Sequence, residues 1–162
     1  MDAHRFLLAD RAQFVLDPAA ALDFVGDPAF GGIALFVGRV RDHNQGRAVT
    51  GISYDAYAPL VLARFAEIAA QAQAEVGPRL KLYIAHAQGR LAIGDIAVVV
   101  AAGTPHRDEA FRACRLVIEA VKYATPIWKQ EHYVEGDSAW SDGASLSPEM
   151  TAAVGVRGPG AS

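Results

Sequence analysis

The chain is poor in cysteine, in net charge and in long apolar runs. Its only cysteine, Cys114, excludes an internal disulfide framework, and a net charge of −3 over 162 residues argues against a broad nucleic-acid surface. No apolar run approaches the roughly 18 residues of a membrane span, and the N-terminus lacks the basic start and long apolar stretch of a signal peptide. We therefore expect a soluble, cytoplasmic protein that binds neither nucleic acid nor membrane.

Several common catalytic motifs are also missing. The sequence contains no GxGxxG, Walker loop, GxSxG or HExxH, and its five histidines form no close ligand pair. We expect no bound metal or cofactor. A phosphate-ester hydrolase or lyase is disfavoured, because it would need a metal cluster or a paired acid and base. His86, within an apolar run, is interpreted as a strand histidine with a satisfied hydrogen bond.

The segments that are present predict a layered α+β domain. Hydrophobic patterns and turn signals favour helices at 18–25, 59–76 and 104–124, and strands at 4–8, 32–40, 51–57, 80–87, 96–102 and 127–134. The strand at 32–40 is interpreted as buried, DHNQGR after it as a turn or mobile loop, and the strands around Gly94 and Asp95 as a hairpin. Such an order favours a mostly antiparallel sheet with two long helices, in one domain at 1–145, followed by a flexible tail at 146–162.

The helix predicted at 104–124 begins with basic residues. Thr104 suits the N-cap and Pro105 the first position, which places His106 and Arg107 beside the unpaired N–H groups of the helix start. This pattern indicates an anion site, although a solvated first turn would contain the same residues. The helix has an apolar stripe of Ala110, Cys114, Val117, Ile118 and Val121, so Cys114 is expected to be a core residue and not a nucleophile.

More charge follows that stripe. Lys122 comes directly after it, and strand alternation puts Lys129 and Glu131 on one face of the next strand. Arg39 and Arg41 share a face by the same alternation. A lysine near other cations or partly desolvated has a lowered pKa and can act as acid, base or nucleophile.

Helix length limits which of these cations can meet. Arg107 and Lys122 are fifteen steps apart, which at about 1.5 Å per residue separates them by roughly 22 Å. Either the two helix ends form two sites, or a two-fold dimer brings His106 and Arg107 of one subunit to Lys122 and Lys129 of the other. We favour the shared pocket.

Four segments in this order and spacing, FVGRVRDHN (36–44), TPHR (104–107), VKYATPIWKQE (121–131) and EGD (135–137), resemble the large subunit of molybdopterin synthase. The similarity extends from about Gly31 to Asp142. It implies an α/β hammerhead fold and a central dimer of large subunits with a small ubiquitin-like subunit at each end. The implied reaction inserts two sulfurs, donated by the thiocarboxylate of the small subunit, into cyclic pyranopterin monophosphate (precursor Z) during molybdenum cofactor biosynthesis.

The resemblance also implies residue roles. Lys122 and Lys129 would be catalytic, and the residues in contact with substrate would be Arg39, Val40, Arg41, His106, Arg107, Lys122, Lys129, Gln130 and Glu131. The chain departs from the family pattern at Arg39, where lysine is frequent, and at Gln130, where arginine is frequent, so contacts at these positions can differ. The alternative is a non-catalytic dimeric module that binds a ubiquitin-like sulfur carrier.

Overall fold

Strands and helices follow one another through residues 2–135 and 139–141, the part of the chain that the computed structural model describes. The elements are β1 (His4–Asp10), α1 (Pro18–Val25), β2 (Gly32–Arg39), β3 (His43–Asn44), β4 (Arg47–Ala56), α2 (Ala58–Val76), β5 (Lys81–Ala92), β6 (Ile96–Thr104), α3 (Arg107–Ala124), β7 (Ile127–Tyr133) and β8 (Ala139–Ser141). The predicted elements are thus all present, with boundaries that differ by a few residues. The predicted tail at 146–162 lies outside the described residues, and the domain limit at 145 stays a prediction.

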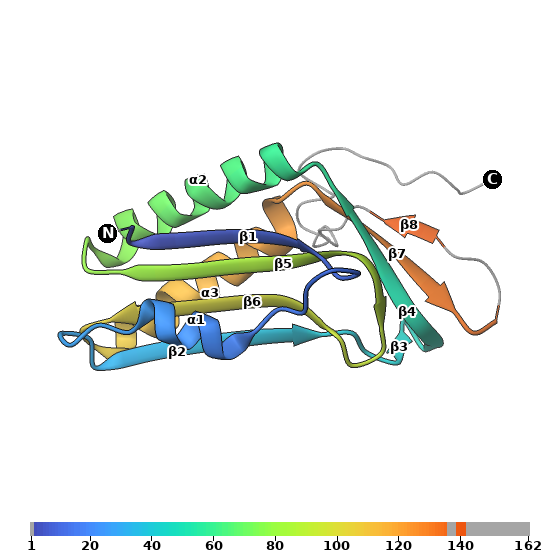
Figure 1. The fold of residues 1–162 in the computed structure, drawn as a ribbon, viewed down its shortest axis with the longest axis horizontal. Helices are drawn as coiled ribbons and strands as arrows, with labels where there is room; N and C mark the ends of the chain where they lie inside the picture. The colour runs from blue at the N-terminus through green and yellow to red at the C-terminus, as the bar shows by residue number, and fades with distance from the viewer. Residues whose placement is uncertain (1, 136–138, 142–162) are drawn as a thin grey trace.

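Strand β5 connects two halves of the sheet. The strand order is β2-β6-β5-β4-β7-β8, with β1 paired to β5 and β3 to β4. The first part of β5 pairs with β6 and, in parallel, with β1, whereas its last four residues from Gly89 to Ala92 pair with β4. Figure 1 shows β4, β7 and β8 turned away from the β1, β2, β5 and β6 half. All other described pairings are antiparallel, which confirms the predicted mostly antiparallel sheet.

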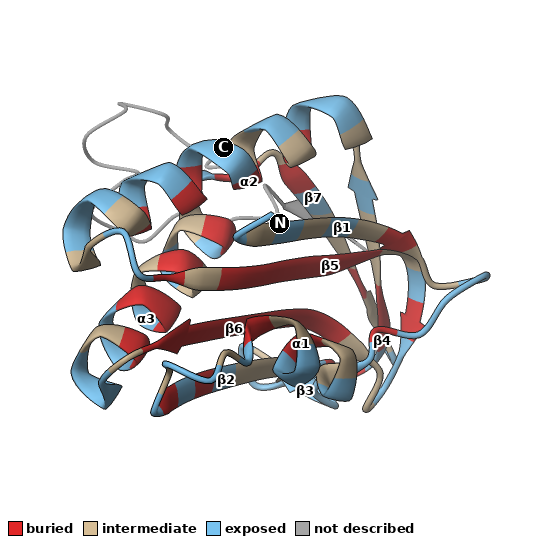
Figure 2. Cartoon of the chain, turned by 60° about the vertical axis from the view of Figure 1, so that its left-hand side comes forward, coloured by how far each residue is buried: buried red, intermediate tan, exposed pale blue. Residues whose placement is uncertain are grey.

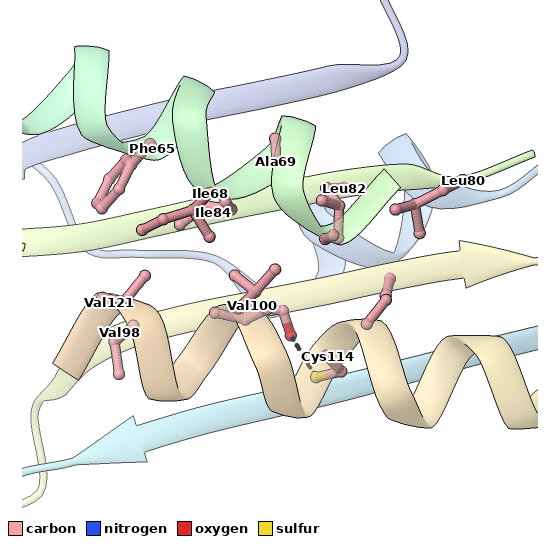
Figure 3. Close-up of a cluster of buried hydrophobic side chains, with 14 of the residues drawn as sticks. Phe65, Ile68, Ala69, Leu80, Leu82, Ile84, Val98, Val100, Cys114 and Val121 are labelled. Atoms are coloured by element: carbon pink, nitrogen blue, oxygen red, sulfur yellow. Dashed lines mark hydrogen bonds between the residues drawn. The ribbon is translucent and has the colours of Figure 1, made fainter. Parts of the chain in front are cut away.

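Both faces of the central strands are covered. The long helices α2 and α3 pack on one face, over a cluster that includes Phe65, Ile68, Leu82, Ile84 and Val100 (Figure 3). Helix α1 covers the other face, where the second cluster contains its Val25 together with β5 and β6 side chains. Successive residues of a strand point to opposite faces, so β5 and β6 are apolar along most of their length and coloured as buried in Figure 2. This arrangement confirms the predicted α+β class.

The start of α3 differs from its prediction. The helix begins at Arg107, and the N-cap is His106 without a side-chain cap bond, so the assignment of Thr104 as N-cap and Pro105 as first helical residue was wrong. Thr104 instead ends β6, opposite Gly32, and its Oγ1 donates to the His106 carbonyl at 2.6 Å. Pairing with β2 keeps Thr104 extended, and sheet hydrogen bonds therefore outweigh its capping preference.

One other prediction needs correction. Strand β2 is a sheet edge, not a fully buried strand, because β6 is its only neighbour among the described strands and Ile33 remains 45% exposed. For the segment after β2, predicted as a turn or a mobile loop, the turn is confirmed, and it joins β3 and β4 in a hairpin. Its two central residues, Gln45 (φ 49°) and Gly46 (φ 77°), both have positive φ, as tight two-residue turns require.

The buried stripe of α3 is largely as predicted, with Ala110, Cys114, Val117 and Val121 buried and Ile118 only half-buried. Within the described part of the chain, no helix is long and apolar enough to cross a bilayer.

Candidate active site

Two adjoining hollows lie where β2, β4, β7 and the end of α3 meet. Both are lined by Arg39, Tyr54, Lys122 and Lys129, and we call them together the basic pocket. One hollow adds His86 and Gly38, and the other adds Arg41, His43, Asn44 and Glu131. The fold therefore joins five of the predicted site residues: Arg39, Arg41, Lys122, Lys129 and Glu131.

A tight turn brings the two lysines together. Lys122 is in the last turn of α3, and Lys129 is on β7, only seven positions later. The helix ends at Ala124, and the C-cap residue Thr125 donates its Oγ1–H to Ala120 O at 3.3 Å. Ile127 N then donates to Thr125 O at 2.8 Å. The chain reverses sharply here, so that a helix end and a strand supply two amines to one cavity.

Burial and neighbouring charge act on Lys122. Desolvation is the main cause that lowers the pKa of its amine, and the positive charges of Lys129 and Arg41 lower this pKa further. A lysine with a lowered pKa supplies more free amine near neutral pH than a solvated one. Lys122 is therefore the best placed proton acceptor or nucleophile of the pocket.

Glu131 provides the negative charge of the pocket. The Glu131 side chain is 9% exposed, and its Oε1 lies 3.7 Å from Lys129 Nζ. Its Oε2 accepts hydrogen bonds from Tyr133 Oη at 2.9 Å and from Asn44 Nδ2. These partners fix the position of the Glu131 side chain beside Lys129.

Sequence reasoning missed two aromatic residues of this pocket. Burial, followed by the charge of Glu131, raises the pKa of Tyr54 to about 12, so its hydroxyl stays protonated. His86 is a buried strand residue whose Nδ1 lies 2.6 Å from Ala87 O, as expected, but it also lines the cavity. Burial lowers the pKa of His86 to about 4 and keeps the imidazole neutral. Sequence periodicity placed both residues on strands, but no motif marked them.

The Arg39–Arg41 stretch enters the pocket only in part. Strand β2 ends at Arg39, after a register shift at Gly38, so Arg41 is outside the strand from which the shared face was predicted. Both arginines nevertheless line the same hollow. Val40 is 4% exposed and packs in the second core cluster, so its side chain does not contribute to the pocket.

Three other predicted residues lie elsewhere. Gln130 is between Lys129 and Glu131 on β7, so strand alternation directs it to the opposite face. His106 and Arg107 line a separate hollow with Gly31, Pro105 and Asp108 at the other end of α3. A single chain therefore does not bring them to the basic pocket, in agreement with the helix-length argument.

Comparisons with known proteins agree with the sequence resemblance. Residues 12–124 match the family described as MoaE protein. The chain is 44% identical over 148 residues to the molybdopterin synthase catalytic subunit of Synechococcus elongatus, covering 88% of this chain and 90% of that protein.

Solved structures share the fold. Molybdopterin synthase from Staphylococcus aureus has a TM-score of 0.76 and 30% identity, with 87% of this chain and 98% of that chain covered. A chain from the complex of subunits 1 and 2 of the Helicobacter pylori molybdopterin-converting factor has a TM-score of 0.63 and 24% identity, over 83% of this chain and 91% of that chain. The matched family and the extent of these similarities show that this chain belongs to the MoaE protein family.

Proposed function

We propose that this protein is the catalytic subunit of a molybdopterin synthase, acting in the cytoplasm. In this reaction, cyclic pyranopterin monophosphate receives two sulfurs from the C-terminal thiocarboxylate of a small ubiquitin-like subunit and becomes the dithiolene of molybdopterin. The observation that carries the proposal is the basic pocket, in which two arginines and two lysines surround a neutral His86 and a protonated Tyr54.

The pocket suits an anionic, ring-shaped substrate. Arg39 and Arg41 offer forked N–H donors for the cyclic phosphate, and the aromatic ring of Tyr54 offers an apolar surface beside them. Lys129 is balanced by Glu131, whereas the pKa of Lys122 is lowered. We assign Lys129 to charge stabilisation and Lys122 to proton transfer or nucleophilic attack at the carbon that receives sulfur.

The sulfur must come from outside the chain. Cys114, the only cysteine, is buried in the helix-side core, and burial raises the pKa of its thiol to about 11. In the proposed reaction the thiocarboxylate sulfur of the small subunit bonds to a pterin side-chain carbon while a carbon–oxygen bond at that carbon breaks. At the carbon that carries the cyclic phosphate, the displaced oxygen stays on the phosphate, whose ring opens, and at the other carbon the oxygen leaves as water. Hydrolysis of the remaining carbonyl–sulfur bond then releases the small subunit as a carboxylate. Two such transfers complete the dithiolene.

The second half of the site would come from another copy of the chain. His106 and Arg107 are basic residues in a hollow of their own, and they lie beyond the reach of a small ligand in the basic pocket of the same chain. We propose a two-fold dimer in which they complete the partner's pocket, within a heterotetramer that has one small subunit at each end. The Helicobacter pylori structure is a complex of subunits 1 and 2 of the molybdopterin-converting factor, which supports a small-subunit partner for this chain.

Reconstitution with purified components tests the proposal. The protein is mixed with cyclic pyranopterin monophosphate and a thiocarboxylated small subunit, and molybdopterin is measured by mass spectrometry. We expect product only when the thiocarboxylate is present, with one small-subunit carboxylate formed for each sulfur inserted. Binding of the small subunit without any product would instead indicate the non-catalytic carrier-binding module.

A further inference from the structure

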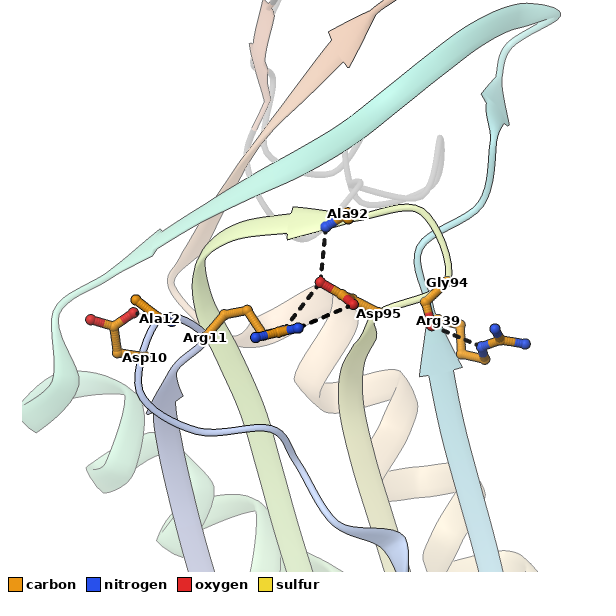
Figure 4. A network of polar contacts seen from close by, with 7 residues as sticks. All are labelled: Asp10, Arg11, Ala12, Arg39, Ala92, Gly94 and Asp95. Atoms are coloured by element: carbon orange, nitrogen blue, oxygen red, sulfur yellow. Dashed lines mark hydrogen bonds and ion pairs between the residues drawn. The ribbon is translucent and has the colours of Figure 1, made fainter.

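We propose that Arg11 and Asp95 are positioning residues for Arg39, because they fix the turn whose carbonyl holds the Arg39 guanidinium at the basic pocket. The inference rests on the proposed function, in which Arg39 contacts substrate. Neither Arg11 nor Asp95 lines the pocket itself. Figure 4 shows the network that connects them.

The turn at 93–95, between β5 and β6, is closed by the side chain of Asp95. Its Oδ2 accepts a hydrogen bond from Ala92 N at 2.9 Å, and Asp95 N donates to Ala92 O at 3.0 Å. The same carboxylate receives Arg11 Nε at 3.1 Å and Arg11 Nη2 at 3.5 Å. These partners also hold the pKa of Asp95 below its ordinary value, with the Ala92 N–H as the main cause.

The same turn at 93–95 also holds the chain at the end of β2. Gly94 N donates to Val40 O at 2.9 Å, and Val40 N donates to Asp95 O at 3.0 Å. Gly94 O then accepts Arg39 Nε at 3.0 Å. This bond uses Nε and leaves the two terminal nitrogens of the guanidinium to bind a phosphate.

Gly94 is needed for this approach. Its φ of 84° is in the left-handed region, and a Cβ at this position would lie 3.0 Å from Arg39 Nη2. The turn therefore contacts the Arg39 guanidinium directly, and its left-handed backbone at Gly94 favours glycine.

Arg11 connects the turn at 93–95 to the loop that follows β1, a part of the chain that is distant in sequence. It follows β1, and its backbone N donates to Gln88 O at 2.9 Å. Asp10 fixes the same loop, since its Oδ1 accepts from Ala12 N at 2.9 Å. The Arg11 and Asp95 side chains remain 34% and 22% exposed, and an ion pair with this exposure adds little to stability. Its main effect is therefore on geometry.

Steady-state kinetics in the reconstituted enzyme test this role. In Arg11→Met and in Asp95→Asn, we expect the KM for cyclic pyranopterin monophosphate to rise roughly 10-fold with little change in kcat, because ground-state positioning is lost. Arg11→Lys, which keeps the charge, should recover part of the loss. Arg115→Met removes an exposed pair with Glu119 elsewhere on α3 and serves as the matched control.

A double-mutant cycle separates positioning from general damage. If Arg11 acts through Arg39, the double variant Arg11→Met with Arg39→Ala should have the KM of Arg39→Ala alone. Multiplying effects, or an unchanged KM in both single variants, would overturn the inference.

A second readout does not need activity. The Arg39 Nε–H is hydrogen-bonded to Gly94 O, so its NMR signal should exchange slowly with water in the wild type and at least several-fold faster in Arg11→Met and Asp95→Asn. Unchanged exchange contradicts the inference. If the wild type makes no molybdopterin, the proposed function fails, while this NMR result still decides whether the network holds Arg39.

Discussion

His86 and Tyr54 meet edge to face in the basic pocket, with their ring centroids 4.8 Å apart and their planes at 81°. His86 is on β5 and Tyr54 is on β4, so this contact joins the two halves of the sheet beside Lys122 and Lys129. A charged imidazole is disfavoured here by burial and by the charge of Lys122.

This burial predicts acid sensitivity. The folded protein keeps His86 neutral down to a pKa of about 4, whereas the unfolded chain binds the proton below about 6.5. The contribution of His86 to stability is therefore complete above pH 6.5 and is lost as the pH falls towards 4. Since each pKa unit corresponds to about 1.4 kcal/mol, the full loss is on the order of 3 kcal/mol.

Urea unfolding between pH 7.5 and pH 4.5 measures this loss. His86→Gln should show a flatter dependence of unfolding free energy on pH than the wild type, whereas the control Gln71→Ala, at an exposed position without a titratable group, should keep the wild-type slope. An equal slope in His86→Gln and the wild type would refute the assignment.

Turnover should depend on Lys122. We expect Lys122→Ala to lower kcat by roughly 10²-fold or more, since it removes the proposed acid–base or nucleophilic group, while circular dichroism and thermal unfolding remain close to wild type. Lys81→Ala is the matched control, because Lys81 binds Gly26 O at 3.2 Å outside the pocket. Normal turnover in Lys122→Ala would remove it from the catalytic residues.

The lowered pKa of Lys122 can be measured without substrate. Lys129→Met and Arg41→Met each remove one of the positive charges that lower this pKa, so either change should raise the pH at which Lys122 reacts half-maximally with an acylating reagent. Peptide mass spectrometry resolves the reaction at Lys122. The reference variant Arg115→Met should leave the midpoint unchanged. A midpoint that moves in none of the variants would mean that Lys129 and Arg41 do not act on Lys122.

The proposed dimer predicts complementation between two inactive variants. Arg107→Ala lacks one half of the shared pocket, and Lys122→Ala lacks the other. In a mixed dimer, one of the two pockets combines the intact Lys122 of the first chain with the intact Arg107 of the second. We expect up to about a quarter of wild-type activity after mixing and subunit exchange, since half of the dimers are mixed and each has one intact pocket.

Tagged subunits verify that exchange has occurred, and a mixture of Arg107→Ala with the double variant Arg107→Ala/Lys122→Ala is the negative control. Exchanged dimers that remain inactive would show that the two groups do not share a pocket.

Cys114 should be dispensable for sulfur transfer. Its Sγ lies in the core, 3.8 Å from Val100 O, and burial raises the pKa of the thiol to about 11. Cys114→Ala should keep the wild-type kcat and lose about 1 kcal/mol of unfolding free energy from the small cavity. In the native wild type, iodoacetamide should label Cys114 only after urea is added. Loss of sulfur transfer in a folded Cys114→Ala protein would contradict an external sulfur donor.

The sequence predicted those features of the site that depend on strand alternation or on helix length. Strand alternation placed Lys129 and Glu131 on one face, and helix length separated Arg107 from Lys122, as the structure has them. The local pattern at Thr104 failed, because pairing between β2 and β6 overrode the capping preference. A tertiary contact, the pairing of Thr104 with Gly32, thus decided whether Thr104 ended a strand or capped a helix.

The rest of the site depends on neighbours that are distant in sequence. Asn44 reaches Glu131 across 87 positions, and Arg11 reaches Asp95 across 84. His86 joins the pocket because Tyr54 of β4 and Lys122 of α3 line the same hollow. No pattern within a single element specifies such contacts.

The turned β5 strand has a further consequence for the enzyme. Gly89, with a φ of 92°, lies where the strand changes from its partners β1 and β6 to its partner β4, and a Cβ there would be 3.2 Å from Asp10 Oδ1. Arg39, on β2, is thus connected through β6 to the first part of β5, whereas Lys129, on β7, is connected through β4 to the last part of β5. The bend of β5 at Gly89 therefore sets how far apart Arg39 and Lys129 lie across the basic pocket.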